Sequence, residues 1–320
     1  MMLRSILLTL LLCLSLPAAA QWHSDSWDSM GTRATLEFWH EGDQGTAIID
    51  AIKQEFERIE QQLSPWIADS ELARFNRLPA NQSVVASDEF CFLLQRSAHY
   101  HAISDGAFDI TFAGAGRLYN YRSGQAPDDD ALRQAVIGMQ HILLHEDGSV
   151  ARDNTSVQID LGGIAKGYAI DRAVAILQHH HVDNAYLSLG GDSYVLGQRN
   201  DRLWQVGIRH PRNAKAIAIT LPLTDIAVST SGDYERFFLR DGEHIHHILN
   251  PRTGKPAGDI MSVTVLTRYG VDADALSTTL FVMGIEKGLA LANRLDNVSA
   301  IIIDRNGKVH YSDDLTDQQN

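Results

Sequence analysis

Apolar and polar residues alternate along some stretches of the chain and recur at helical spacing along others. The stretch 34–40, "ATLEFWH", alternates residue by residue, which predicts a strand with one buried face. In 46–63 the apolar residues recur at spacings of three and four, which predicts a helix with one apolar face. Ser87 is typical of an N-cap, and it predicts a helix over about 88–103.

Predicted strands dominate the middle of the chain. The stretch 141–153 predicts a hairpin that turns at Asp147 and Gly148. "SVQIDL" (156–161) predicts a strand, and a helix is expected after it, through about Gln178. Further strands are expected over "AYLSLGGDSYVLG", "LWQVGI", "AIAITLPL", "IAVSTS" and "MSVTVLT".

Two helices and a hairpin complete the predicted elements. The helices are expected at about 272–283 and 285–294, and "SAIIIDRNGKVHYS" predicts a closing hairpin. Strands and helices are mixed along the whole chain, which predicts an α/β (α+β) mixed sandwich. We expect residues 21–320 to form a single domain.

Composition and charge exclude some classes of protein. The chain has 320 residues, 44% of them hydrophobic and 21% charged, which suits a globular protein with a large core. Its formal net charge is -13, which disfavours binding to nucleic acid, because such binding requires positively charged side chains that neutralise the phosphates.

The N-terminal stretch has the pattern of a secretory signal peptide. The apolar run "SILLTLLLCLSL" follows Arg4 and ends in small residues before Gln21, so residues 1–20 are predicted to be removed on export. The run is too short to span a bilayer. Lipidation of Cys13 is a second interpretation, which the bulky Leu12 disfavours. Cys91 is then the one cysteine of the mature chain, and we expect it to be a small core residue.

Three turns rich in small residues are candidates for ligand binding. "DLGGIAKGYAID" (160–171) places two glycines before a predicted helix and Lys166 in its first turn. Backbone N–H groups at a helix start, with a lysine, form an anion site, and glycine allows a phosphate to approach the main chain. A tight turn with a solvated lysine explains the same residues. Two similar turns at 187–197 and 229–238 favour an extended ligand that carries phosphates.

The stretch "VDADALSTTLFVMG" (271–284) combines acids and hydroxyls with an apolar helix. Asp274 and Thr278 are four residues apart and share a helical face. With a backbone carbonyl they would form an all-oxygen site of the kind that Mg²⁺ prefers. The alternative is that Asp272 or Asp274 caps the helix.

Three histidines precede a turn in "HIHHILNPRTG" (244–254), where a histidine could act as a base, bind a ligand or be merely exposed. The chain has no zinc-type spacing of histidines or cysteines, so zinc is not expected.

Taken together, these motifs resemble the ApbE flavin transferases, or FAD:protein FMN transferases. The similarity extends from about 27 to 284 and includes "MGT", "LSPWIADSELARFN", "GAFDIT", "DLGGIAKGYAID", "LGGD", "VGIRHP", "STSGDYERFF", "HHILNPRTG" and "DADALSTTLFVMG". The resemblance implies the family's mixed α/β sandwich. It also implies an exported, Mg²⁺-dependent enzyme that transfers FMN from FAD to a threonine or serine hydroxyl of an acceptor protein and releases AMP.

The resemblance also implies roles for individual residues. Asp274 and Thr278, with the backbone carbonyl of Ala165, resemble the metal ligands. His247 resembles a residue that acts as a base or positions the acceptor, and Lys166 and Asp274 are the other expected catalytic residues. The residues that resemble FAD contacts are Met30, Trp66, Ala107, Phe108, Asp109, Asp160, Lys166, His247 and Ile248. For Trp66, a role as a partly buried core aromatic is the alternative to stacking on the ligand.

The chain departs from the family pattern after "FDIT". A glycine-proline-leucine segment and a tryptophan are usual there, but this chain reads "FAGAGRLYNYRSG", with Tyr119 and Tyr121. Ser188 also stands before "LGGD", where asparagine is common. Contacts to the adenine side or to the acceptor are therefore expected to differ.

Three functions remain open on the sequence alone. The first is a periplasmic flavin transferase, associated with the inner membrane, that modifies a membrane redox subunit. The second is an FAD pyrophosphatase that uses the same Mg²⁺ site and releases FMN and AMP. The third is a non-catalytic periplasmic flavin-binding protein, against which the retained Asp274 and Thr278 argue.

Overall fold

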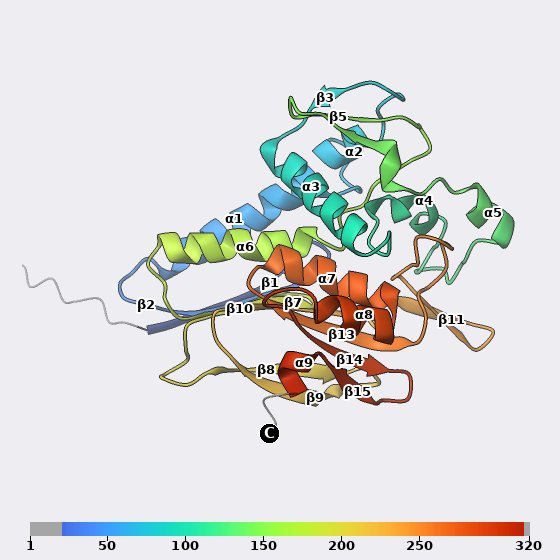
Figure 1. Cartoon of the computed structure of the whole chain (residues 1–320). Coiled ribbons are helices and arrows are strands. Elements are labelled where there is room, and N and C mark those ends of the chain that lie inside the picture. Colours follow the sequence, from blue (N-terminus) through green and yellow to red (C-terminus); the bar gives the residue numbers. More distant parts are fainter. Residues whose placement is uncertain (1–20, 317–320) are drawn as a thin grey trace, which may run out of the picture.

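An eight-stranded antiparallel sheet forms the central layer of the computed structural model, which describes residues 21–316 (Figure 1). Its strand order is β1-β2-β6-β7-β10-β13-β14-β15. The bounds of these strands are β1 (Gln21–Ser29), β2 (Thr32–His40), β6 (Ala185–Leu189), β7 (Asp192–Leu196), β10 (Ile226–Gly232), β13 (Ile260–Thr267), β14 (Ser299–Asp304) and β15 (Val309–Tyr311). The predicted signal peptide at 1–20, with Cys13, lies outside the described residues.

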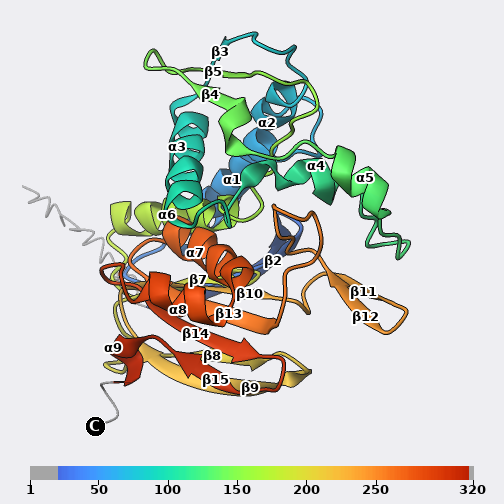
Figure 2. The ribbon, with the colours of Figure 1, turned by 45° about the vertical axis from the view of Figure 1, so that its right-hand side comes forward.

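Helices cover one face of this sheet, and a separate ribbon covers the other (Figures 1 and 2). The helices on that face are α1 (Gly45–Leu63), α2 (Glu71–Phe75), α3 (Asp88–Ile103), α4 (Ala113–Gly116), α5 (Asp129–Gln134), α6 (Ala165–His179), α7 (Gly270–Met283) and α8 (Ile285–Ala292), with short 3-10 turns at Ile110–Phe112 and Met139–His141. The short helix α9 (Asp313–Thr316) lies on the side of the ribbon. The ribbon consists of β8 (Trp204–His210) and β9 (Asn213–Leu223). The predicted mixed sandwich is confirmed.

Burial follows the patterns in the sequence. The predicted apolar face of α1 is buried in the main core, where Ile52, Phe56 and Ile59 are fully enclosed. Every residue of β13 is buried, because α7 lies on one face of that strand and the β8–β9 side of the molecule on the other. Trp204, Val206 and Ile208 of β8 pack on the sheet to form a second hydrophobic cluster.

Two smaller sheets lie outside the central layer. One contains β3 (Val84–Val85), β5 (Ser149–Arg152) and β4 (Ile142–Leu144), which confirms the hairpin predicted at 141–153. The other is the hairpin of β11 (Phe237–Arg240) and β12 (Glu243–His246), which projects from the body in Figure 2. Neither this hairpin nor β1 is predicted from the pattern of the sequence.

The strand predicted for "SVQIDL" is wrong. Residues 156–161 join no sheet, although Val157, Ile159 and Leu161 are buried as the alternation requires. Side-chain and loop partners replace a strand neighbour: the Asn76 side chain exchanges two hydrogen bonds with the backbone of Ile159, both 2.8 Å long. An alternating pattern reports which side chains are buried, but it does not show that a neighbouring strand is available.

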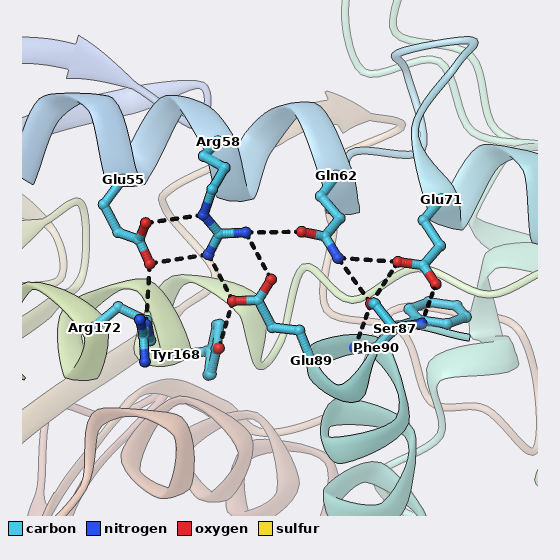
Figure 3. A network of polar contacts seen from close by, with 9 residues as sticks. All are labelled: Glu55, Arg58, Gln62, Glu71, Ser87, Glu89, Phe90, Tyr168 and Arg172. Carbon is cyan, nitrogen blue, oxygen red and sulfur yellow. Dashed lines mark hydrogen bonds and ion pairs between the residues drawn. The ribbon is translucent and has the colours of Figure 1, made fainter. Parts of the chain in front are cut away.

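A polar network connects helices α1, α3 and α6 of the helical layer (Figure 3). Arg58 of α1 donates to Glu55 on its own helix and to both oxygens of Glu89 on α3. Glu55 also accepts a hydrogen bond from Arg172 of α6 at 3.0 Å, and Glu89 accepts one from Tyr168 of the same helix. Helices that are distant in sequence are thus held at fixed separations above the sheet.

Ser87 caps α3 as predicted, since its side chain accepts a hydrogen bond from the backbone N–H of Phe90 at 3.2 Å. Cys91 is partly buried against the main core, in agreement with a packing role. Among residues 21–316, no helix combines the length and apolar character needed to cross a bilayer.

Candidate active site

Two facing glycines bring α6 and α7 together at the site. A Cβ atom added to Gly167 would lie 2.0 Å from the backbone oxygen of Gly270, and one added to Gly270 would lie 2.5 Å from the oxygen of Gly167. No side chain larger than hydrogen fits at either position without moving backbone. This close approach places Lys166, next to Gly167, beside Asp274 on α7.

Lys166 contacts two buried carboxylates. Its Nζ lies 2.5 Å from Oδ2 of Asp192, at the start of β7, and 3.3 Å from Oδ2 of Asp274. Each aspartate is only 3% exposed, and Asp274 also accepts the backbone N–H of Gly167 at 3.0 Å. One ammonium group therefore faces two carboxylates, so the cluster retains a surplus negative charge within the protein.

The pKa values in this cluster reflect that imbalance. Burial raises the pKa of Asp274 above its usual value, and the neighbouring Asp192 raises it further, whereas Lys166 and the Gly167 N–H oppose the shift. Burial alone would lower the pKa of Lys166, but Asp192 and Asp274 raise it above its ordinary value. A cation next to Asp274 would neutralise the surplus charge.

A line of hydroxyl groups extends from the same cluster across β10 to α7. Ser229 donates to Oδ1 of Asp192 at 2.6 Å, and its oxygen lies 3.0 Å from Oγ of Ser277. Ser231 contacts Ser277 at 2.9 Å and Oγ1 of Thr278 at 3.2 Å. The predicted pair of Asp274 and Thr278 thus lies on one face of α7, supported from behind by strand residues.

Neither Asp272 nor Asp274 caps α7, so that interpretation is wrong. The helix begins at Gly270, and its first N–H groups are bound by Asp171 of α6, which accepts from Gly270 at 2.6 Å and from Val271 at 2.9 Å. Asp272 instead pairs with Arg96 of α3. Because Asp171 already satisfies the start of the helix, Asp274 is available for another role.

The glycine turn before α6 is held by its own aspartate. Oδ1 of Asp160 accepts the N–H of Gly162 at 2.7 Å. Burial raises the pKa of Asp160, opposed by that hydrogen bond and by Arg117 and Arg236. A Cβ atom added to Gly163 would lie 3.4 Å from Oγ1 of Thr278, so this turn passes directly beside the predicted metal ligands. The predicted third ligand, Ala165, is the first residue of α6.

The three histidines of "HIHHILNPRTG" have different environments. His246 is buried: its Nε2 donates to the backbone oxygen of Ala257 at 3.0 Å, and its Nδ1 accepts from the N–H of Ile248 at 3.3 Å. Burial lowers the pKa of His246 to about 4, so it is a neutral structural residue. Ile248, a predicted FAD contact, is buried beside it.

His247 follows β12 and is half-buried. Its Nδ1 is enclosed and finds no hydrogen-bond partner among the described residues, although its backbone N–H donates to the oxygen of Arg236. Burial, and then Arg236, lower the pKa of His247 to about 3. The imidazole is therefore neutral, and its enclosed Nδ1 is left without a partner among residues 21–316.

The side chain of Asp109 organises the loop at 107–112. Its Oδ1 accepts the N–H and the hydroxyl of Thr111, and its Oδ2 accepts the N–H of Met139 at 3.2 Å. Phe108 is buried, and Ala107 precedes it at the end of the turn after α3. A cleft of about 410 Å³ adjoins the loop and is lined by His101, Ala102, Asp105, Gly106, Asp109, Ile137, Pro251 and Arg252.

Met30 is partly buried against the main core, whereas Trp66 is exposed. Met30 is in the β1–β2 turn with φ of 49°, and its N–H donates to Glu60 at 3.1 Å, beside a cleft of about 460 Å³. Trp66 is 80% exposed, so the alternative of a core aromatic is wrong. Its indole is free to contact a ligand.

Among residues 21–316, no three histidine, cysteine, aspartate or glutamate side chains converge as a metal site. The predicted set differs in kind, because it contains one carboxylate, one hydroxyl and one carbonyl. Such a set suits an ion that keeps water or phosphate oxygens as its remaining ligands. The surplus negative charge beside Asp274 and the all-oxygen donors fit Mg²⁺ better than a softer metal.

Comparison with known proteins agrees with this arrangement. The model of the ApbE family matches residues 30–302. The chain belongs to the ApbE family. It is 36% identical over 292 residues to the FAD:protein FMN transferase of Treponema pallidum (strain Nichols), covering 84% of this chain and 81% of that protein. The corresponding Vibrio cholerae protein (Classical Ogawa 395) is 30% identical over 280 residues, with 83% of each chain covered.

Solved structures of the family have the same fold. An ApbE protein from Thermotoga maritima superposes with a TM-score of 0.86 at 30% identity, covering 92% of this chain and 98% of that one. The flavin transferase ApbE from Vibrio cholerae gives a TM-score of 0.83 at 27% identity, covering 93% and 99%. The prediction of an enzyme of the flavin transferase family is confirmed.

Several residues at the site are absent from the predicted set. Asp192 is the acid of "LGGD", and Ser229 and Ser231 belong to "STSGDYERFF". The signal in the sequence was an acid or hydroxyl adjoining a turn of small residues, which by itself does not distinguish a turn from a site.

Proposed function

We propose that this protein transfers FMN from FAD to a threonine or serine hydroxyl of an acceptor protein, with Mg²⁺ as cofactor. The observation that carries the proposal is the buried Lys166–Asp192–Asp274 cluster, whose surplus negative charge lies beside Thr278 and the glycine turn. A site for FAD alone, without a metal, would not need an uncompensated carboxylate at this position.

The residues that would hold Mg²⁺ are Asp274 and Thr278, with a backbone carbonyl from the turn that leads into α6, predicted at Ala165. When bound, the ion would withdraw charge from the phosphate oxygens of FAD. Lys166 supplies a fixed positive charge at the same place, because Asp192 and Asp274 keep it protonated and oriented.

In the proposed reaction the hydroxyl oxygen of the acceptor attacks the phosphorus of the FMN half. A new P–O bond forms, the bond from that phosphorus to the bridging oxygen breaks, and AMP leaves with the bridging oxygen and its electron pair. The proton of the hydroxyl must leave in the same process.

We propose that His247 interacts with that hydroxyl. Its pKa of about 3 makes it a weak base in the free protein, so orienting the hydroxyl, and not removing its proton, is the role that fits best. The phosphates of bound FAD would raise this pKa, because a nearby negative charge favours the protonated imidazole.

The exposed indole of Trp66 is available to stack on a ring of FAD, and Met30, Ala107, Phe108, Asp109, Asp160 and Ile248 are the other proposed contacts. Asp109 and Asp160 would act through the loops that they hold, since their oxygens already accept backbone N–H groups.

The test is an incubation of residues 21–320 with FAD, Mg²⁺ and an acceptor domain that carries an exposed threonine motif. Flavin fluorescence on a denaturing gel is measured, with Asp274→Ala in parallel. A fluorescent acceptor band that requires Mg²⁺ and Asp274 supports the proposal. Free FMN and AMP without a band would show an FAD pyrophosphatase, and intact bound FAD with any acceptor would show a flavin-binding protein.

We also propose export to the periplasm, with membrane redox subunits as the acceptors. The support is the signal-peptide pattern of residues 1–20. N-terminal sequencing of the protein recovered from the periplasm should begin at Gln21. A protein retained in the cytoplasm with Met1 intact would contradict the proposal, and a lipidated Cys13 would replace it.

A further inference from the structure

The hydroxyl groups behind the site form a chain whose proton directions can be derived. The oxygens follow one another in the order Asp192, Ser229, Ser277, Ser231, Thr278, with successive separations of 2.6, 3.0, 2.9 and 3.2 Å. Ser229 and Ser277 are fully buried, so protein groups alone satisfy them, while Ser231 and Thr278 lie nearer the surface of the site.

Each hydroxyl has one proton to donate, so counting the protons shows which group donates in each contact. Asp192 receives donors on both sides, from Lys166 and from Ser229, so the proton of Ser229 is committed to Asp192. The 3.0 Å hydrogen bond between Ser229 and Ser277 must then use the proton of Ser277, which also points toward the backbone oxygen of Asp274 at 3.0 Å. Ser277 therefore has no proton left for Ser231.

The contact between Ser231 and Ser277 therefore uses the proton of Ser231. The remaining contact, from Ser231 to Thr278, must use the proton of Thr278. The O–H bond of Thr278 is thus directed inward, toward β10, and its free lone pair is left for the side of the glycine turn, where Gly163 lies.

We propose that Ser277 and Ser231 are positioning residues that orient Thr278 as a lone-pair donor to a divalent cation. The same orientation prevents Thr278 from donating a hydrogen bond to a phosphate oxygen. The inference rests on the proposed function, since it assigns Thr278 to the metal. It adds that Ser231, in the turn at 229–238, and Ser277, on α7, act on the cation and not on the flavin.

The experiment measures Mn²⁺ binding to the protein without FAD, from the electron paramagnetic resonance signal of the free ion. Removing the inward acceptor, as in Ser231→Ala, should weaken Mn²⁺ binding by about tenfold, the size of one hydrogen bond to a charged centre. Ser231→Thr restores the hydroxyl and should bind Mn²⁺ within about threefold of the unmodified protein.

Thr230→Val is the matched control. Thr230 lies on the same strand, and its hydroxyl pairs with Thr264 at 2.8 Å on the opposite face, away from the chain. This variant should bind Mn²⁺ as the unmodified protein does. If Ser231→Ala does not fold, as judged by circular dichroism, Ser277→Ala provides the second test with the same expected loss.

The outcomes separate the two proposals. If the unmodified protein does not bind Mn²⁺ or Mg²⁺, the metal of the proposed function is refuted. If it binds Mn²⁺ and folded Ser231→Ala binds equally well, the proposed function stands and the orientation of Thr278 by Ser231 is refuted. Weakened binding in Ser231→Ala that Ser231→Thr restores, with Thr230→Val unchanged, supports the inference.

Discussion

Two polar networks of this protein, the one in Figure 3 and the one at the candidate site, differ in their balance of charge. In the part of the network of Figure 3 that joins α1, α3 and α6, the guanidinium groups of Arg58 and Arg172 face the carboxylates of Glu55 and Glu89. Glu71, at the other end of the drawn network, accepts hydrogen bonds from Gln62 and Ser87 and has no cationic partner there. In the site, Lys166 alone faces two buried carboxylates. A balanced network stabilises the charged forms of its members, whereas an unbalanced one retains a charge that a ligand can neutralise.

The pKa values of Glu55 and Asp274, one carboxyl group from each network, are shifted in opposite directions. Hydrogen bonding to Arg58 lowers the pKa of Glu55 to about 2, although its burial opposes this. In the site, burial and Asp192 raise the pKa of Asp274 despite Lys166. The first network is built for stability, and the second maintains an unfavourable electrostatic arrangement in which a cation would be bound.

The largest expected effect comes from neutralising the surplus charge. Asp274→Asn keeps an oxygen for the Gly167 N–H but removes the carboxylate that we propose to bind Mg²⁺, so flavin transfer should fall at least about a hundredfold. Its melting temperature without metal should be unchanged or higher, because a buried repulsion disappears. Calorimetry measures the melting temperature, and the gel assay measures flavin transfer. A large loss of thermal stability would contradict the view that the site carries a surplus negative charge.

The network of Figure 3 should respond in the opposite way. Arg58→Met removes the partner of two carboxylates, and we expect it to lower the free energy of unfolding by roughly 1 kcal/mol, since the network is partly exposed. Flavin transfer and Mn²⁺ binding should be unchanged in the folded variant. Urea unfolding at pH 7 measures the stability change, and Glu57→Gln, on the exposed face of α1, is the control.

The smallest effect is the dependence of stability on pH. The folded pKa of Glu55 is lowered from 4.5 to about 2, so its contribution is present above pH 4.5 and is lost as pH falls toward 2. The folded pKa of His246 is lowered from 6.5 to about 4, so its contribution is lost earlier, between pH 6.5 and 4.

Substitutions should separate these two ranges of pH. In unfolding curves, Glu55→Gln should flatten the loss of stability below pH 4.5, and His246→Gln should flatten the loss between pH 6.5 and 4. If each variant changed the other range instead, the assignment of the two pH ranges to Glu55 and His246 would be wrong.

Local patterns predicted an element correctly where its apolar face is buried and a neighbouring element is available to pack on it. The helix at 46–63 and the strand at 34–40 are confirmed, because one face of each packs on the same core. The strand predicted for "SVQIDL" is wrong because the neighbours of this segment are a side chain and a loop, and no strand pairs with it. The β11–β12 hairpin, which is half-exposed, has no clear alternation to detect.

The candidate site also contains residues that local patterns predicted and residues that they did not. Asp274 and Thr278 are four residues apart on one helix, so local geometry was enough to pair them. Asp192 and Ser231 are 82 and 43 residues from Asp274 by their numbers, and no periodicity connects such positions. Their place depends on the order of β7 and β10 in the sheet.

The sequence by itself thus determined the helices and strands with one clear apolar face, the metal-like pair on α7 and, through its motifs, membership of the ApbE family. Only the tertiary structure decided that Lys166 faces two acids, that Asp171 caps α7, and that three serines support Thr278. The reason is physical: periodicity encodes which side chains are buried, whereas charge balance and proton direction depend on contacts between distant segments.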